Sequence, residues 1–175
     1  VFPLVLCAVG MVASSIGIQF VRVGKNGKPG AALNRGTVIT CAIFGVLATL
    51  LNILCGFNTG VLIATLSGLV IAVLIGFCTD YFTNDERRPV QQVAAMSKSG
   101  SAITIITGLS YGLISILPSI IGIVGATLAA YYAAEAFGIS GIYGIGIAAV
   151  GMLSITSVIV SADAYGPIVD NAKGI

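Results

Sequence analysis

The chain has 175 residues, of which 57% are hydrophobic and only 8% are charged, and its mean hydropathy is +1.09. Soluble globular domains carry roughly 25% charged residues, so this composition excludes a water-facing surface over most of the chain. The net charge of +2, with no basic patch among aromatic residues, excludes nucleic acid as a partner. The absence of histidine removes the commonest general base and metal ligand.

Apolar runs long enough to cross a bilayer as helices, about 20 residues each, recur along the whole chain. Helices are expected because an open sheet edge leaves backbone groups unsatisfied in lipid. Pro118 should kink the fourth run, since proline removes one helix hydrogen bond. The fold predicted is an all-α, polytopic transmembrane helix bundle with about five spans, at 1–23, 36–55, 60–82, 102–135 and from 142 to beyond 165.

Residues 1–175 are expected to form a single transmembrane region within a longer protein. The chain begins with Val1, already inside an apolar run, and ends at Ile175 directly after a polar stretch. The first run lacks the basic leader of a signal peptide and is longer than its apolar core. We therefore expect an internal fragment.

Two polar loops, at 24–35 and 83–101, separate the spans on one side of the membrane. The connectors at 56–59 and 136–141 contain no lysine or arginine. Since positively charged loops stay cytoplasmic, the two basic loops are predicted to face the cytoplasm and the fifth span to end there. The basic residues in and beside these loops are Arg22, Lys25, Lys28, Arg35, Arg87, Arg88 and Lys98.

Asp163 and Asp170 lie near the end of the fifth span, where acidic residues are costly unless they face a bundle interior or an aqueous cavity. Seven residues apart on a helix, they share one face and are separated by about 10.5 Å along the axis. Two carboxylates and the amide of Asn171 are hard oxygen ligands suited to Mg²⁺. On spacing alone, an ordinary polar helix end at the interface explains them equally well. Glu135, at the outer end of the fourth span, is expected to be a solvated interfacial charge.

The segment ADAYGPIVDNAKGI resembles the DAYGPI-x-DNAGGI segment of the membrane-integral, ion-pumping inorganic pyrophosphatases. GFCTDYFTNDERRPVQQVA, SGSAITIITGLSYGL and GIYGIGIAAVGMLS resemble further stretches of that family in the same order, and VFPLVLCAVGMVASSIG resembles the helix after its DNVGDCAGM region. The resemblance covers the whole chain, which corresponds to a middle portion of a family member. Lys173 departs from the family pattern, which most often has glycine there.

The resemblance implies a Mg²⁺-dependent enzyme that hydrolyses inorganic pyrophosphate on the cytoplasmic side. It implies coupling to outward transport of H⁺ or Na⁺, a homodimer, and a multi-pass location that we expect to be a bacterial plasma membrane. Asp170 matches an acidic residue of the family's hydrolysis site, and Asp163 and Asn171 are the further candidate metal ligands. The family's other acidic and lysine motifs are absent from this chain, so the fragment alone is expected to be inactive.

Two other functions remain as alternatives. One is a secondary transporter in which a broken helix and the Asp163/Asp170 pair bind a coupling ion. The other is a membrane scaffold without catalytic activity. A transporter predicts internal symmetry and carboxylates near mid-membrane, whereas this sequence has no evident repeat and its carboxylates lie at a span end.

Overall fold

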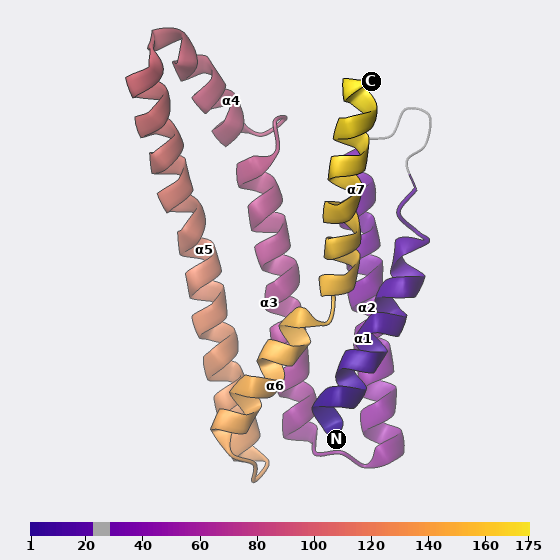
Figure 1. Cartoon of the computed structure of the whole chain (residues 1–175). Helices are drawn as coiled ribbons and strands as arrows, with labels where there is room; N and C mark the ends of the chain where they lie inside the picture. Colours follow the sequence, from indigo (N-terminus) through magenta and orange to yellow (C-terminus); the bar gives the residue numbers. More distant parts are fainter. Residues whose placement is uncertain (23–28) are drawn as a thin grey trace. The chain divides into compact units, whose positions relative to one another are not determined.

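The structure, a computed structural model, describes residues 1–22 and 29–175, without the side chains of Pro29, Ala162 and Tyr165. Lys25 and Lys28 of the first expected loop lie outside the described residues. The described chain is entirely helical (Figure 1). Its helices are α1 (Phe2–Ile18), α2 (Pro29–Cys55), α3 (Thr59–Thr83), α4 (Arg88–Met96), the 3₁₀ turn η1 (Ser97–Ser99), α5 (Ser101–Ala136), α6 (Gly141–Leu153) and α7 (Thr156–Gly174).

Four helical stretches of the described chain are long and apolar enough to cross a membrane. They are Gly30–Cys55, Thr59–Ser99, Ser101–Ala136 and Gly141–Gly174, and the shorter α1 is also apolar. This confirms the predicted all-α, polytopic membrane fold. The 17 residues of α1 give a helix about 25 Å long, at the short end of the range that spans a bilayer.

The helix bounds differ from the expected spans mainly on either side of the first loop. α1 ends at Ile18, where the amides of Phe20 and Val21 turn back onto the carbonyls of Gly17 and Ile18. α2 begins at Pro29, seven residues before the expected start, because proline is favoured at a first helical position and the following alanines and leucine favour helix. α5 runs as one helix through Pro118.

The fifth expected span corresponds to one candidate membrane span, Gly141–Gly174, which consists of two helices. α6 ends at Leu153 and α7 begins at Thr156, with Ser154 and Ile155 between them. Ser154 hydrogen-bonds the Gly151 carbonyl with both its amide (3.3 Å) and its hydroxyl (2.6 Å). The hydroxyl thus satisfies a carbonyl at the end of α6 within an apolar segment.

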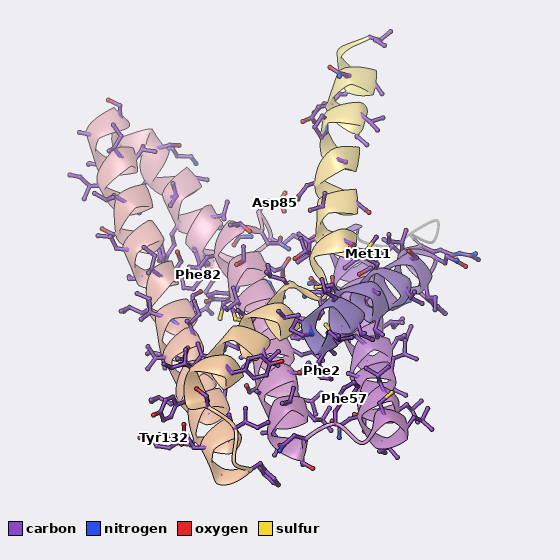
Figure 2. All side chains as sticks on the ribbon, turned by 60° about the horizontal axis from the view of Figure 1, so that its bottom comes forward. Phe2, Met11, Phe57, Phe82, Asp85 and Tyr132 are labelled. Carbon is purple, nitrogen blue, oxygen red and sulfur yellow. The ribbon has the colours of Figure 1, made fainter. Side chains whose placement is uncertain are left out.

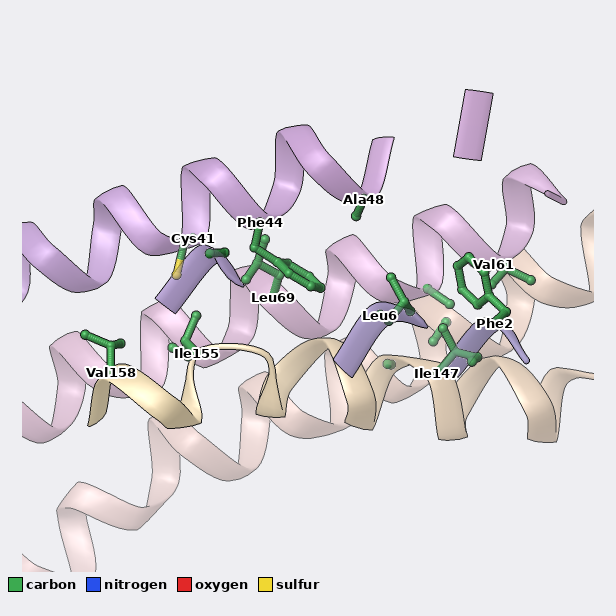
Figure 3. Close-up of a cluster of buried hydrophobic side chains, with 14 residues drawn as sticks. Phe2, Leu6, Cys41, Phe44, Ala48, Val61, Leu69, Ile147, Ile155 and Val158 are labelled. Carbon is green, nitrogen blue, oxygen red and sulfur yellow. The ribbon is translucent and has the colours of Figure 1, made fainter. Parts of the chain in front are cut away.

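By its contacts the chain divides into two compact units, residues Val1–Val73 with Ala126–Ile175, and residues Leu74–Gly125. The first unit holds the hydrophobic core, to which α1, α2, α3, α5, α6 and α7 all contribute (Figure 3). Phe44 of α2, Leu6 of α1 and Ile147 of α6 are almost fully buried there. Within this unit α1 packs against α2, α6 and α7.

Helices α3 and α6 approach each other closely in the first unit because two glycines face the opposite backbone. A Cβ on Gly68 would overlap the carbonyl of Ala148, and a Cβ on Gly151 would overlap the carbonyl of Thr65. The two contacts are reciprocal, since each helix contributes one glycine and one backbone carbonyl. Small residues give membrane helices this close approach.

The two connectors without basic residues lie together at one end of the first unit. The Asn58 side-chain amide donates to the Phe137 carbonyl (2.9 Å), which joins the α2–α3 and α5–α6 connectors. The exposed carboxylate of Glu135 accepts the amide of Gly141 (2.7 Å) and so caps the start of α6. Phe2 packs on Phe57 at the same end, with ring centroids 4.6 Å apart (Figure 2). Both connectors therefore lie on one side, as the loop charges predict.

The second unit contains the end of α3, the helix α4 with η1, and most of α5. The expected second loop is thus partly helical. Pro89 occupies the first turn of α4 and is buried, whereas Asp85, Arg87 and Arg88 are exposed. Asp80 accepts a hydrogen bond from the Asn84 side chain (3.2 Å).

Large apolar side chains project from the surface of both units (Figure 2). On α5 they recur every four residues, at Ile105, Leu109, Leu113, Leu117 and Ile121, and each is more than half exposed. Such a surface is unfavourable in water and favourable against lipid or other apolar helices.

Candidate functional site at the end of α7

Helix α7 carries all three residues that the sequence singles out for chemistry. Asp163, Asp170 and Asn171 are exposed on it, and the helix continues through Pro167 to Gly174. Lys173 lies in its last turn, where a cation interacts favourably with the negative end of the helix dipole. The predicted helical placement of these residues is therefore confirmed, and all of them are accessible on the described chain.

The helix places Asp163 and Asp170 on one face, two turns apart. Their separation along the axis is about 10.5 Å at 1.5 Å per residue. Mg²⁺ binds oxygen at about 2.1 Å, so ligands of one ion lie within roughly 4 Å of each other. The two carboxylates therefore cannot ligate the same ion directly. Asp170 and Asn171 are adjacent in sequence and exposed at the same level of the helix, with their side chains about 100° apart around its axis.

The end of α7 lies at the end of the first unit where α1 ends and α2 begins (Figure 1). Within that unit α7 packs against both α1 and α2. Arg22 and Arg35, both exposed, belong to this end. It is opposite to the end that holds the Asn58–Phe137 hydrogen bond. The carboxylates thus share a side with Arg22 and Arg35, which belong to or flank the first basic loop, as expected from the sequence.

Within the described residues, no group of three or more His, Cys, Asp or Glu side chains could hold a metal ion. The donors present have the hard oxygen chemistry that Mg²⁺ requires, but octahedral coordination needs six ligands. Asp170 and Asn171 would supply a minority of them, with water, a phosphate-bearing substrate or other residues completing the set.

The sequence comparisons identify the family. Residues 1–175 match the family described as inorganic H⁺ pyrophosphatase. The chain belongs to that family. The match spans every helix of the fold, including the α7 end that carries Asp163 and Asp170.

Curated relatives of this chain are named as ion pumps. It is 44% identical over 176 residues to the putative K⁺-stimulated pyrophosphate-energized sodium pump of Clostridium tetani, with 99% of this chain and 26% of that protein covered. It is 39% identical over 189 residues to the K⁺-insensitive pyrophosphate-energized proton pump of Caldanaerobacter subterraneus, covering 99% of the chain and 27% of that pump. The chain thus spans about a quarter of the length of these relatives.

A shorter relative, the pyrophosphate-energized proton pump 2 of Mycoplana dimorpha, is 35% identical over 190 residues. The alignment covers 99% of this chain and 87% of that sequence. The chain is accordingly a multi-pass membrane protein whose relatives include pumps named for protons and for sodium.

One contact at the base of α7 was not predicted from the sequence. The Ser14 hydroxyl of α1 donates to the Ser154 carbonyl (3.5 Å), at the break from which α7 starts. Gly10 and Ser14, four residues apart on α1, are the sequence feature that indicates a close helix contact here, because small residues mark close helix approach. Their partner could not be inferred from the sequence, because Ser154 lies 140 residues from Ser14.

Proposed function

We propose that this chain is part of an ion-pumping membrane pyrophosphatase that hydrolyses inorganic pyrophosphate to phosphate at the cytoplasmic face. Hydrolysis is coupled to outward transport of H⁺ or Na⁺ by a homodimer in a bacterial plasma membrane. The observation that carries the proposal is the family match over residues 1–175. The accessible carboxylates, at the same end as Arg22 and Arg35, support a cytoplasmic site.

Asp170 is assigned to the hydrolysis site, with its carboxylate and the Asn171 amide oxygen as Mg²⁺ ligands. Bound Mg²⁺ would neutralise pyrophosphate and stabilise charge on the transferred phosphoryl oxygens. Asp163, two turns away on the same face, is assigned either to a separate ion or to a supporting hydrogen bond, because it cannot share the ion bound by Asp170. Arg22, Arg35 and Lys173 add positive charge at this end, which favours the approach of a polyanionic substrate.

A secondary transporter is the second candidate, and the break between α6 and α7 is the observation that favours it. Transporters of this kind bind ions and substrates at discontinuous helices near the bilayer centre. The carboxylates of this chain lie on α7 some 8 and 15 residues beyond Ile155, away from the break. This separation favours the pyrophosphatase.

The test uses the full-length protein in membrane vesicles oriented with the cytoplasmic face outward. Addition of Mg²⁺ and pyrophosphate should release phosphate and drive H⁺ or ²²Na⁺ into the vesicles, and chelation of Mg²⁺ should stop both. Ion-driven transport without phosphate release would establish the transporter instead. Neither activity would leave a scaffold as the function.

A further inference from the structure

Two small residues of α1 contact the break between α6 and α7. Gly10 and Ser14 lie four residues apart, on one face of α1, and both are buried. A Cβ on Gly10 would lie 2.9 Å from the Ser154 carbonyl oxygen and 3.2 Å from its Cα. The Ser14 hydroxyl reaches the same oxygen at 3.5 Å. Both residues therefore contact the backbone of Ser154 itself.

Among the described residues of α7, burial is confined to its base. Ile155 and Val158 are 2% and 1% exposed and belong to the core, whereas the described side chains from Ile159 to Ile175 are exposed. Both α1 and α2 pack against α7, and the buried residues at its start lie directly after the point where α1 contacts the Ser154 backbone. Because α7 is one continuous helix, a change in direction at its base displaces all residues farther along it.

The length of α7 amplifies any change at this base. Asp170 follows Ser154 by 16 residues, which is about 24 Å of helix. A rotation of only about 2.5° at the base moves a group 24 Å away by about 1 Å, a displacement that can cost about 100-fold in rate at a reacting centre. Asp163, about 13 Å from Ser154, moves roughly half as far.

We propose that Gly10 and Ser14 are positioning residues, which hold the Ser154 backbone and thereby set the place of Asp163 and Asp170 relative to pyrophosphate. The inference rests on the proposed function. Gly10 contributes by having no side chain, which lets α1 approach the Ser154 carbonyl. Ser14 contributes a hydroxyl that donates a long hydrogen bond (3.5 Å) to that carbonyl at the break between the two helices.

The test compares Gly10→Ala and Ser14→Ala with Gly146→Ala in the full-length protein. Gly146 is a matched control, because it lies on α6, is exposed, and has nothing within 4 Å of an added Cβ. Each variant is assayed for kcat, for KM of pyrophosphate and for the Mg²⁺ concentration that gives half activity. Spin labels at positions 142 and 168, both on exposed residues, report the distance between α6 and α7 after the native cysteines are replaced.

Gly10→Ala should lower kcat tenfold or more and shift or broaden the distribution of label distances. Ser14→Ala should change kcat and the label distances in the same direction but by less. Gly146→Ala should change neither. Activity loss with an unchanged distance distribution, or equal effects of Gly10→Ala and Gly146→Ala, would overturn the inference. If Gly10→Ala does not fold, Ser14→Ala, which removes only one oxygen, decides alone. The label distances depend on no enzymatic activity, so a parent protein without pyrophosphate hydrolysis would refute the proposed function separately.

Discussion

The crossing of α3 and α6 allows one prediction to be worked in detail. Gly68→Ala places a methyl group against the Ala148 carbonyl, and a backbone carbonyl within a helix cannot rotate away as a side chain can. Forcing an extra methyl into a packed interior costs about 1–3 kcal/mol. The same change also gains up to about 1 kcal/mol of helix propensity, because alanine favours helix over glycine.

Gly76→Ala, on the same helix, separates these two contributions. Nothing lies within 4 Å of a Cβ at Gly76, so this variant should show only the propensity gain. The difference in unfolding free energy between the two variants should therefore be about 1–3 kcal/mol, with Gly68→Ala the less stable. The measurement is an SDS titration of the purified protein in mixed micelles, followed by helical circular dichroism. Equal stability of the two variants would show that α3 and α6 do not cross at these glycines.

Three further outcomes are expected. Cysteines introduced at Lys25 and Lys98 should resist an impermeant reagent added from outside intact cells, and labelling at both positions would reverse the predicted topology. Glu135→Ala should lower the unfolding free energy by about 1 kcal/mol, because it removes the acceptor of the Gly141 amide. Glu135→Gln keeps an acceptor oxygen and should retain near-parent stability. Loss of ion transport in the stable Gln variant would mean instead that the carboxylate carries the ion. The purified 175-residue chain should release no phosphate from pyrophosphate with Mg²⁺, because α7 supplies too few ligands, and sustained turnover would contradict that.

The membrane helices were predictable because the bilayer fixes their length. The bounds expected for the third and fourth spans differ from those of α3 and α5 by one residue at each end. The start of α2 was missed because its first turns, from Pro29, are polar enough to look like loop although their residues favour helix. Polarity sets where a span leaves the membrane, whereas local propensity and capping set where its helix begins.

The break at Ser154 and Ile155 was not predictable from local sequence. No proline or glycine occupies either position, and the adjoining residues are apolar or hydroxyl-bearing. The features that accompany the break are the Ser154 hydrogen bonds to Gly151 and the contacts from Gly10 and Ser14, which lie some 140 residues earlier in the chain. Sequence periodicity carries no information on such long-range contacts.

The shared face of Asp163 and Asp170 followed from helical periodicity alone, and the structure keeps both on one helix. Their assignment to a hydrolysis site rests on the family. Helix spacing excludes a metal ion shared by the two carboxylates. It does not identify the remaining ligands, since no group of three or more His, Cys, Asp or Glu side chains is found among the described residues.

The most direct test of the account is the specific activity of Asp170→Asn in the full-length protein, measured per folded molecule with thermal stability in parallel. The substitution keeps the size of the side chain and one acceptor oxygen but removes the negative charge assigned to Mg²⁺. Hydrolysis should fall by about 10²–10³ or more with unchanged stability, since the residue is exposed and fills no core. Hydrolysis should fall less in Asp163→Asn, because Asp163 is proposed to lie outside the ligand set of the ion that Asp170 binds. Near-parent hydrolysis by Asp170→Asn would contradict the account, because the carboxylate would then bind neither metal nor substrate.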